Sequence, residues 1–238
     1  MRRFVLSILS TLALGGSAVA ADLAPMYAAP PPTWAGFYVG VNVGGGAGDG
    51  RSDYSFGGAR IPRINNLMWG AIGGGQVGWN GQMGAIVYGM EADFQASGLG
   101  GTLKAPDCPP AACGVLVTAS YKQDMPWYGT ARGRLGYAMG GWLAYATGGY
   151  AYTQLQTRAE ARASAVTASA SDNQFRNGWT VGAGVEMMIT PMISARLEYM
   201  YLDFGNQTTS WQAAATPVFT HTSNLTMNVV RAGVNLRF

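Results

Sequence analysis

The stretch WYGTARGRLGY, residues 127 to 137, carries the two features that decide the fold. Its end aromatics, Trp127 and Tyr137, lie ten positions apart, so in an extended strand both point to the same face. Ten residues span about 33 Å along a strand, and a tilt of about 40° projects this to ~25 Å, the height of an outer-membrane apolar band. Arg132 and Arg134 fall on the opposite face. Because Trp and Tyr favour both membrane–water interfaces, the stretch predicts a membrane-crossing strand with an aromatic lipid face and a charged interior face.

The same aromatic spacing recurs on two other segments. Trp69 and Trp79 are ten positions apart, and so are Trp142 and Tyr152. The side-chain register within Trp142–Thr153 is ambiguous from the sequence, so the second pair remains an alternative. A soluble core gives no reason for a fixed ten-residue spacing. The repeats therefore indicate two aromatic girdles, one at each membrane surface.

Alternation of apolar with small or polar residues, the signal of a β-strand, begins after Trp34 and recurs along the chain. The first strand places Phe37, Val39 and Val41 on one face. Seven further strands are expected at about Leu67–Asn80, Ile86–Ala96, Met125–Ala138, Trp142–Thr153, Phe175–Ile189, Ile193–Asp203 and Leu225–Phe238. Bacterial single-chain barrels have an even number of strands. We therefore expect an all-β fold, an eight-stranded antiparallel up-and-down transmembrane β-barrel over residues 34–238.

The connections between these strands alternate in length. Tight turns are expected at residues 81–83, 139–141 and 190–192. Long loops rich in Gly, Ser, Thr and Ala are expected at Ala47–Asn66, Ser97–Asp124, Gln154–Asp172 and Phe204–Asn224. Within the third loop, the segment Ala159–Ala170 could form a short helix, and the sequence does not decide between helix and loop. Short periplasmic turns and long exterior loops are typical of outer-membrane barrels, so the long loops are predicted to be surface-exposed.

Charged residues of the predicted strands gather on the face opposite the apolar one. This face carries Glu91, Asp93, Arg132, Arg134, Glu186, Arg196, Glu198 and Arg231. An arginine facing lipid near the membrane midplane costs about 2–4 kcal/mol, so these residues belong inside the barrel. An eight-stranded barrel is just wide enough for side chains to fill it. We therefore expect an ion-pair network that plugs the lumen, with the acids of the third strand pairing with the arginines of the fourth.

The N-terminal residues 1–20 are predicted to be a signal peptide. Their apolar core, Phe4–Leu14, follows two arginines and is too short to span a bilayer. An A-x-A cleavage site ends at Ala20, which implies export. Residues 21–33 are rich in proline, which favours an extended chain over a strand, and are predicted to be a periplasmic linker.

Charge and cysteine content limit the other function classes. Only 11% of residues are charged, and loss of the leader lowers the formal charge from +3 to about +1, which excludes a nucleic-acid footprint. Cys108 and Cys113 would meet an oxidising compartment after export, where they can form a disulfide. A zinc site is the alternative, but one cysteine pair without a nearby histidine fits it poorly.

Seven motifs in order resemble the small outer-membrane immunogenic proteins of alpha-proteobacteria. They are WAGFYVGVNVGG (34–45), GGGQVGWN (73–80), YGMEADF (88–94), WYGTARGRLGY (127–137), GWTVGAGVE (178–186), ARLEYMYLDFG (195–205) and VVRAGVNLRF (229–238). The resemblance implies a porin-like barrel that supports envelope integrity and is exposed to host immunity, and some relatives have been linked to haemin binding. The terminal Phe238 also resembles the C-terminal signal that the barrel-assembly machinery recognises.

No catalytic motif emerges from the sequence. Gly73–Gly78 fits G-x-G-x-x-G, but a strand end and a turn follow where a dinucleotide site needs a helix. The lone His221 has no G-x-S-x-G serine to serve. We therefore expect neither an enzyme nor a cofactor or metal site, and we expect outer-membrane lipid, lipopolysaccharide and the barrel-assembly machinery as partners. The alternative to a structural barrel is a small pore or a ligand-binding protein, for example for haemin.

Overall fold

The computed structural model describes residues 33–56, 59–104, 117–163, 166–211 and 219–238. These ranges form the strands β1 (Gly36–Phe56), β2 (Ala59–Met83), β3 (Ile86–Lys104), β4 (Val117–Met139), β5 (Trp142–Ala163), β6 (Val166–Met188), β7 (Ile193–Trp211) and β8 (Phe219–Arg237). Within the same ranges, no helix has the length and hydrophobicity needed to cross a membrane. The predicted signal peptide and all of the predicted linker except Thr33 lie outside the described residues, so both remain predictions.

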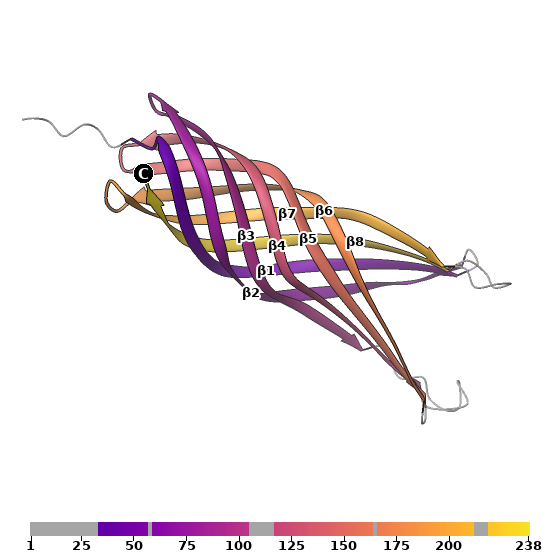
Figure 1. The fold of residues 1–238 in the computed structure, drawn as a ribbon. Helices are drawn as coiled ribbons and strands as arrows, with labels where there is room; N and C mark the ends of the chain where they lie inside the picture. The colour runs from indigo at the N-terminus through magenta and orange to yellow at the C-terminus, as the bar shows by residue number, and fades with distance from the viewer. Residues whose placement is uncertain (1–32, 57–58, 105–116, 164–165, 212–218) are drawn as a thin grey trace, which may run out of the picture. The chain divides into compact units, whose positions relative to one another are not determined.

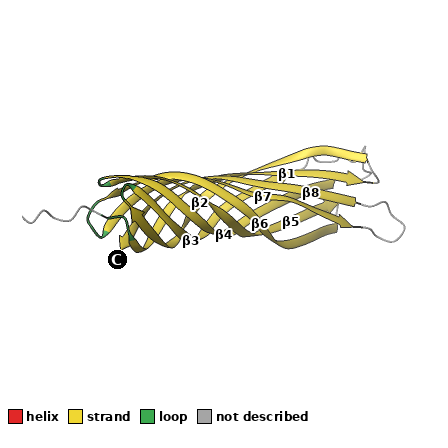
Figure 2. Cartoon of the chain, turned by 90° about the horizontal axis from the view of Figure 1, so that it is seen from above, coloured by secondary structure: helices red, strands yellow, loops and turns green. Residues whose placement is uncertain are grey.

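The eight described strands close into a barrel in sequence order, because β1 pairs with β8 as well as with β2. Every pair is antiparallel, and Figures 1 and 2 show the strands winding obliquely around one axis. Closure lets the backbone groups of the wall bond to neighbouring strands, which lipid cannot do for them. The prediction of an eight-stranded up-and-down barrel is confirmed.

The tight turns and the C-terminus lie at the same end of the barrel (Figure 1). Two of the turns contain glycines in the left-handed region, Gly84 with φ +61° and Gly140 with φ +62°, where a side chain would be strained. In the turn between β6 and β7, the Thr190 hydroxyl accepts the backbone N–H of Ile193 at 3.0 Å. Short turns mark the periplasmic end of such barrels.

At the opposite end, the prediction of four long loops was wrong for most of their length. Ala47–Asn66, for instance, continues β1 and β2 in antiparallel pairing as far as the Phe56–Ala59 pair. The candidate helix Ala159–Ala170 lies in β5 and β6 instead, apart from residues 164–165, which lie outside the described ranges. These segments have the composition of loops. They nevertheless continue the antiparallel strand pairs of the barrel, because each added pair gives their backbone N–H and C=O groups hydrogen-bond partners.

The strand extensions beyond the barrel separate into two groups. The β2–β3 ladder ends at the Trp69–Gly100 pair and the β6–β7 ladder ends at the Trp179–Asp203 pair, whereas the other ladders continue outward. The outer parts of β7, β8, β1 and β2 therefore form one group, and those of β3 to β6 form the other (Figure 1).

The exterior of the barrel is apolar and carries the predicted girdles. At the outer girdle, Trp127 stacks on Phe94 with ring centroids 5.5 Å apart and meets Tyr152 edge-on at 6.0 Å. The open question of register in β5 is now settled, because Leu143 and Tyr145 are buried inside while Trp142 is exposed. Trp142 and Tyr152 therefore share the outward face, as the ten-residue spacing suggested.

Glycines on the inward face make room for the large lumen side chains. A Cβ at Gly78 would lie 2.3 Å from the Tyr38 ring, and one at Gly184 would lie 2.6 Å from the Tyr145 hydroxyl. Both contacts are closer than any side chain tolerates, so a large residue on one strand requires glycine on the next. This complementarity positions the interior groups described below.

Candidate functional site

Inward-facing side chains fill the barrel in three layers along its axis. At the periplasmic end Trp34 packs with Val87, Leu143 and Tyr145. The middle layer is polar and charged, and the outer layer is an apolar cluster. All eight charged residues predicted for the lumen lie in the middle layer and are at most 5% exposed. The candidate site is therefore this filled interior.

Arg132 on β4 is the centre of the largest ion cluster. Its Nη2 contacts Glu91 and lies 2.9 Å from Asp93 Oδ2, while its Nη1 lies 2.9 Å from Glu198 Oε1. The same Nη1 donates to the Thr147 hydroxyl at 3.0 Å. One guanidinium thus bridges three acids, two from the neighbouring β3 and one from β7 across the lumen.

Two further arginines share these acids. Arg196 on β7 contacts Glu91. Arg231 on β8 lies 3.1 Å from Asp93 Oδ2, and its Nε donates to Glu198 Oε2 at 2.7 Å. Three acids therefore face three arginines, and the formal charges of the cluster cancel.

The pairing expected between Arg134 and the acids of β3 is not what the structure contains. The residue opposite Arg134 on β3 is Gly89, and the guanidinium contacts Glu186 of β6 instead. The second oxygen of Glu186 accepts hydrogen bonds from the Ser194 hydroxyl and, at 2.8 Å, from Asn235 Nδ2. A long side chain can cross a narrow lumen, so its position on the ladder does not fix its partner.

Tyr38 joins the two ion groups. Its hydroxyl donates to Glu91 Oε2 at 2.7 Å and accepts from Arg134 Nη1 at 3.4 Å. Gln76 extends the connection by donating to Asn235 Oδ1 at 2.8 Å. Each of the eight described strands therefore contributes a side chain. We call this connected group the lumen network: Tyr38, Gln76, Glu91, Asp93, Arg132, Arg134, Thr147, Glu186, Ser194, Arg196, Glu198, Arg231 and Asn235.

Burial makes the lumen network sensitive to the loss of any charged member. Taking ions out of water costs several kcal/mol each, and only close partners offset this cost. In the lumen network the four acids and the four arginines each contact at least one opposite charge. Removal of one partner would strand a buried charge among strands that lie far apart in sequence.

Trp34 closes the periplasmic end and is fully buried. Its indole Nε1 donates to the Gly140 carbonyl at 3.3 Å, and its backbone N–H donates to Gln82 Oε1 at 2.6 Å. The Arg237 guanidinium lies 4.8 Å from the ring centroid and donates to the Thr33 carbonyl. The sequence placed Trp34 at the start of the barrel but did not indicate that it would cover the opening, because its partners, Gln82 at the end of β2 and Gly140 in the β4–β5 turn, are distant in sequence.

The apolar outer layer of the lumen was missed at the sequence level. Its members include Met68, Met125, Met200, Leu202, Phe204 and Met227, all of which are buried. A signal was available, since on β7 the inward face that carries Arg196 and Glu198 continues at every second position into Met200, Leu202 and Phe204. The lumen therefore has an apolar layer on the outer side of its charged middle layer.

The charged side chains of the lumen network neutralise one another. In the part of the chain that the structure describes, no three His, Cys, Asp or Glu side chains are arranged to hold a metal ion. The acids that could serve as bases are each engaged by arginine, as described above.

Comparison with known proteins assigns the family. Residues 9–238 match the model of the outer membrane protein beta-barrel domain. The chain belongs to the outer membrane protein beta-barrel family. It is 30% identical to the 31 kDa outer-membrane immunogenic protein of Brucella melitensis in an alignment of 243 residues, and this alignment covers 98% of this chain and 97% of that protein. It is 33% identical to a 22 kDa outer membrane protein of Rhizobium leguminosarum in an alignment of 180 residues, and this alignment covers 74% of this chain and 66% of that protein.

These family relatives confirm the resemblance to the immunogenic proteins and the outer-membrane location. They are named as outer-membrane proteins and not as enzymes. Among solved structures, OprG of Pseudomonas aeruginosa matches with a TM-score of 0.51 and 14% identity over 86% of this chain and 97% of that chain. The outer membrane protease OmpT of Escherichia coli matches with a TM-score of 0.50 and 11% identity over 84% and 97%. At these identities the likeness concerns the fold alone.

The predictions for the two cysteines, His221 and Phe238 differ in how they compare with the structure. Cys108 and Cys113 lie outside the described residues, so the disulfide stays a prediction. The backbone of His221 pairs with Tyr54 and Thr209, so this residue lies in β8 and not in a loop as expected. Phe238 faces outward and is 71% exposed, and its backbone N–H donates to the Phe37 carbonyl at 3.0 Å.

Proposed function

We propose that this protein is a closed structural barrel of the outer membrane that supports envelope integrity, and that the lumen network acts as a plug. The observation that carries the proposal is that all eight described strands contribute to one buried, charge-balanced network. A solute crossing the lumen would have to break several ion pairs at once. It would also have to pass Trp34, which covers the periplasmic opening, and the apolar outer layer of the lumen.

We infer a non-catalytic role that needs no bound cofactor. The acids of the lumen are neutralised by arginines, which leaves them poorly suited to act as bases. The outward apolar band would contact lipid acyl chains, and in the outer leaflet it would contact lipopolysaccharide. The strand extensions beyond the outer girdle would present the surface that reaches the exterior, consistent with the immunogenic character in the relatives' names.

Planar-bilayer recording of the refolded full chain tests the plug. We expect no stepwise conductance from the parent protein, because its lumen is filled by buried ion pairs. A known porin, inserted into the same bilayer, serves as the positive control for insertion and recording. Regular conductance steps from the parent chain would contradict the plug and favour the alternative, a small pore.

We further propose that the barrel-assembly machinery recognises Phe238 as a C-terminal assembly signal. Its exposed ring ends the alternating outward face of β8, which also presents Val234 and Leu236. Deletion of Phe238 should lower the fraction of chain assembled in the outer membrane while synthesis stays constant. Pulse-labelling followed by membrane fractionation measures both quantities.

The conservative variant Phe238→Trp provides the control for this test. It keeps an aromatic ring and the backbone hydrogen bond to Phe37, so it should assemble close to the parent level. Equal assembly of the deletion and the parent would remove the signal role from Phe238.

A further inference from the structure

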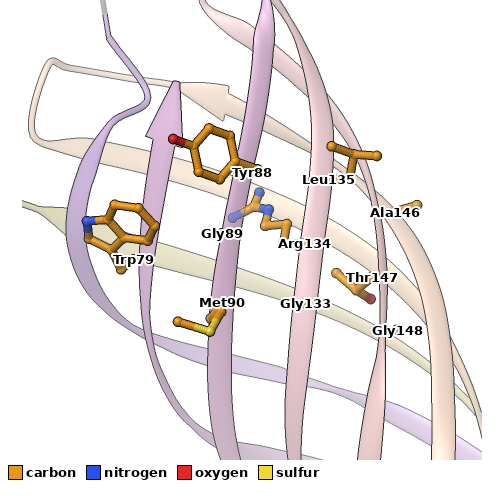
Figure 3. Close-up of a pocket in the computed structure, with 10 residues that line it drawn as sticks. All are labelled: Trp79, Tyr88, Gly89, Met90, Gly133, Arg134, Leu135, Ala146, Thr147 and Gly148. Carbon is orange, nitrogen blue, oxygen red and sulfur yellow. The ribbon is translucent and has the colours of Figure 1, made fainter. Parts of the chain in front are cut away.

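A groove of about 560 Å³ indents the lipid-facing wall of the barrel across β2, β3, β4 and β5. Figure 3 shows Trp79, Tyr88 and Met90 on one side of the groove and Leu135 on the other. This volume lies within the range of about 300–1,000 Å³ that is typical of ligand sites. The groove opens outward, because Met90 and Leu135 are both more than half exposed.

Two glycines create the hollow. Gly133 on β4 and Gly148 on β5 are register partners and face outward, so the floor lacks side chains. A Cβ at either position would meet nothing closer than 3.8 Å. Unlike the inward glycines, these are not required by crowding. The groove therefore results from the choice of small residues at two adjacent lipid-facing positions.

The depth of the groove places it in the periplasmic half of the membrane. Gly133 and Gly148 lie near the middle of the ten-residue aromatic intervals on their strands. The other end of the groove reaches the periplasmic girdle, where Trp79 and Tyr88 meet edge-on with centroids 6.0 Å apart. Between these limits the outward side chains are apolar, because Arg134 and Thr147, which also line the groove, are buried in the lumen.

We propose that this groove binds one phospholipid from the periplasmic leaflet, with an acyl chain lying over the glycine floor. The Tyr88 hydroxyl and the Trp79 indole stand where the ester and headgroup region begins, as aromatic belts do. Lipopolysaccharide occupies the opposite leaflet, beyond the reach of this groove. A two-fold contact with a second copy would place hollow against hollow and leave both unfilled, which close packing disfavours.

Photolabelling of the full chain tests the proposal. The protein is reconstituted in vesicles of phosphatidylethanolamine and phosphatidylglycerol, in which a fraction of the phosphatidylethanolamine carries a photoactivatable acyl chain. We expect labelling to concentrate on the peptides that contain Met90 and Leu135. In Gly148→Leu the new side chain fills the floor, so the excess labelling of these two peptides over the rest of the lipid-facing wall should be lost, because the acyl chain no longer has the space or the van der Waals contacts of the hollow.

Gly75→Leu is the matched control. Gly75 also faces lipid, lies on β2 outside the groove, and has ordinary space for a Cβ, with the nearest atom at 3.6 Å. This variant should keep the labelling at Met90 and Leu135. If Gly148→Leu fails to assemble, as judged by its folded band in cold detergent, Ala146→Leu narrows the same groove from an exposed position on β5.

Several outcomes would overturn the proposal. Even labelling around the barrel, or unchanged labelling in the filled variant, would mean that lipid does not prefer the groove. Labelling of the groove by a photoactivatable lipopolysaccharide would reassign the occupant and its leaflet. Crosslinks between two copies through Met90 or Leu135 would make the groove a protein interface.

Discussion

Replacement of Arg132 with alanine is expected to lower the free energy of unfolding by about 3–5 kcal/mol, the usual cost of stranding buried charges. The side chain is completely buried and contacts Glu91, Asp93 and Glu198. Without it, three acids would share two arginines, and the balanced cluster would carry one uncompensated negative charge. Urea unfolding of the protein in lipid vesicles measures the loss.

A second substitution tests whether the loss comes from charge imbalance. In Arg132→Ala combined with Asp93→Asn, two acids face two arginines again, and the amide can still hydrogen-bond near Arg231 and Thr130. The double variant should therefore recover part of the stability, a non-additivity that only contacting groups show. Additive losses would indicate that the two residues act independently.

Lys122→Ala on the same strand is the control for this series. Lys122 lies 2.9 Å from Asp124, but its side chain is half exposed. Exposed ion pairs contribute about 0–1 kcal/mol, so this variant should be nearly as stable as the parent. A loss as large as that of Arg132→Ala would mean that burial does not set the cost.

The two faces of the wall could be predicted from the sequence because a strand has a period of two. Once Trp127 and Tyr137 were assigned to lipid, Arg132 and Arg134 had to point inward, and both are buried there. The strand order followed from the short turns, since neighbours in an up-and-down barrel are joined directly. Local patterns therefore specify which side of the sheet a residue occupies.

What the sequence could not predict depends on contacts between distant strands. Alternation assigns Arg134 to the lumen, but only the closed barrel brings Glu186 of β6 within its reach. The position of Trp34 over the periplasmic opening depends in the same way on turns that are remote in the chain. Strand length was also underestimated, because composition favoured loops where pairing continued.

Replacement of Ala131, one position before Arg132, with arginine should be nearly as harmful as replacement of Arg132 with alanine. Ala131 faces outward, between Ala92 on β3 and Tyr150 on β5, near the middle of the apolar band. Ala131→Arg should destabilise the protein by about 2–4 kcal/mol, the cost of arginine on the lipid face at the midplane. Urea unfolding in the same vesicles provides the comparison.

Met139→Arg is the matched control, because Met139 is exposed on the same strand and the same face but lies at the end of β4 beside the periplasmic turn. There the guanidinium can reach water along its aliphatic stem, so the cost should fall to about 0–1 kcal/mol. If the face were in contact with water instead of lipid, arginine would be tolerated equally at both positions. A difference that depends on depth can arise only where the medium changes along the strand. Arg132 and Ala131 are adjacent in sequence and experience opposite media, so one side requires an arginine and the other excludes it.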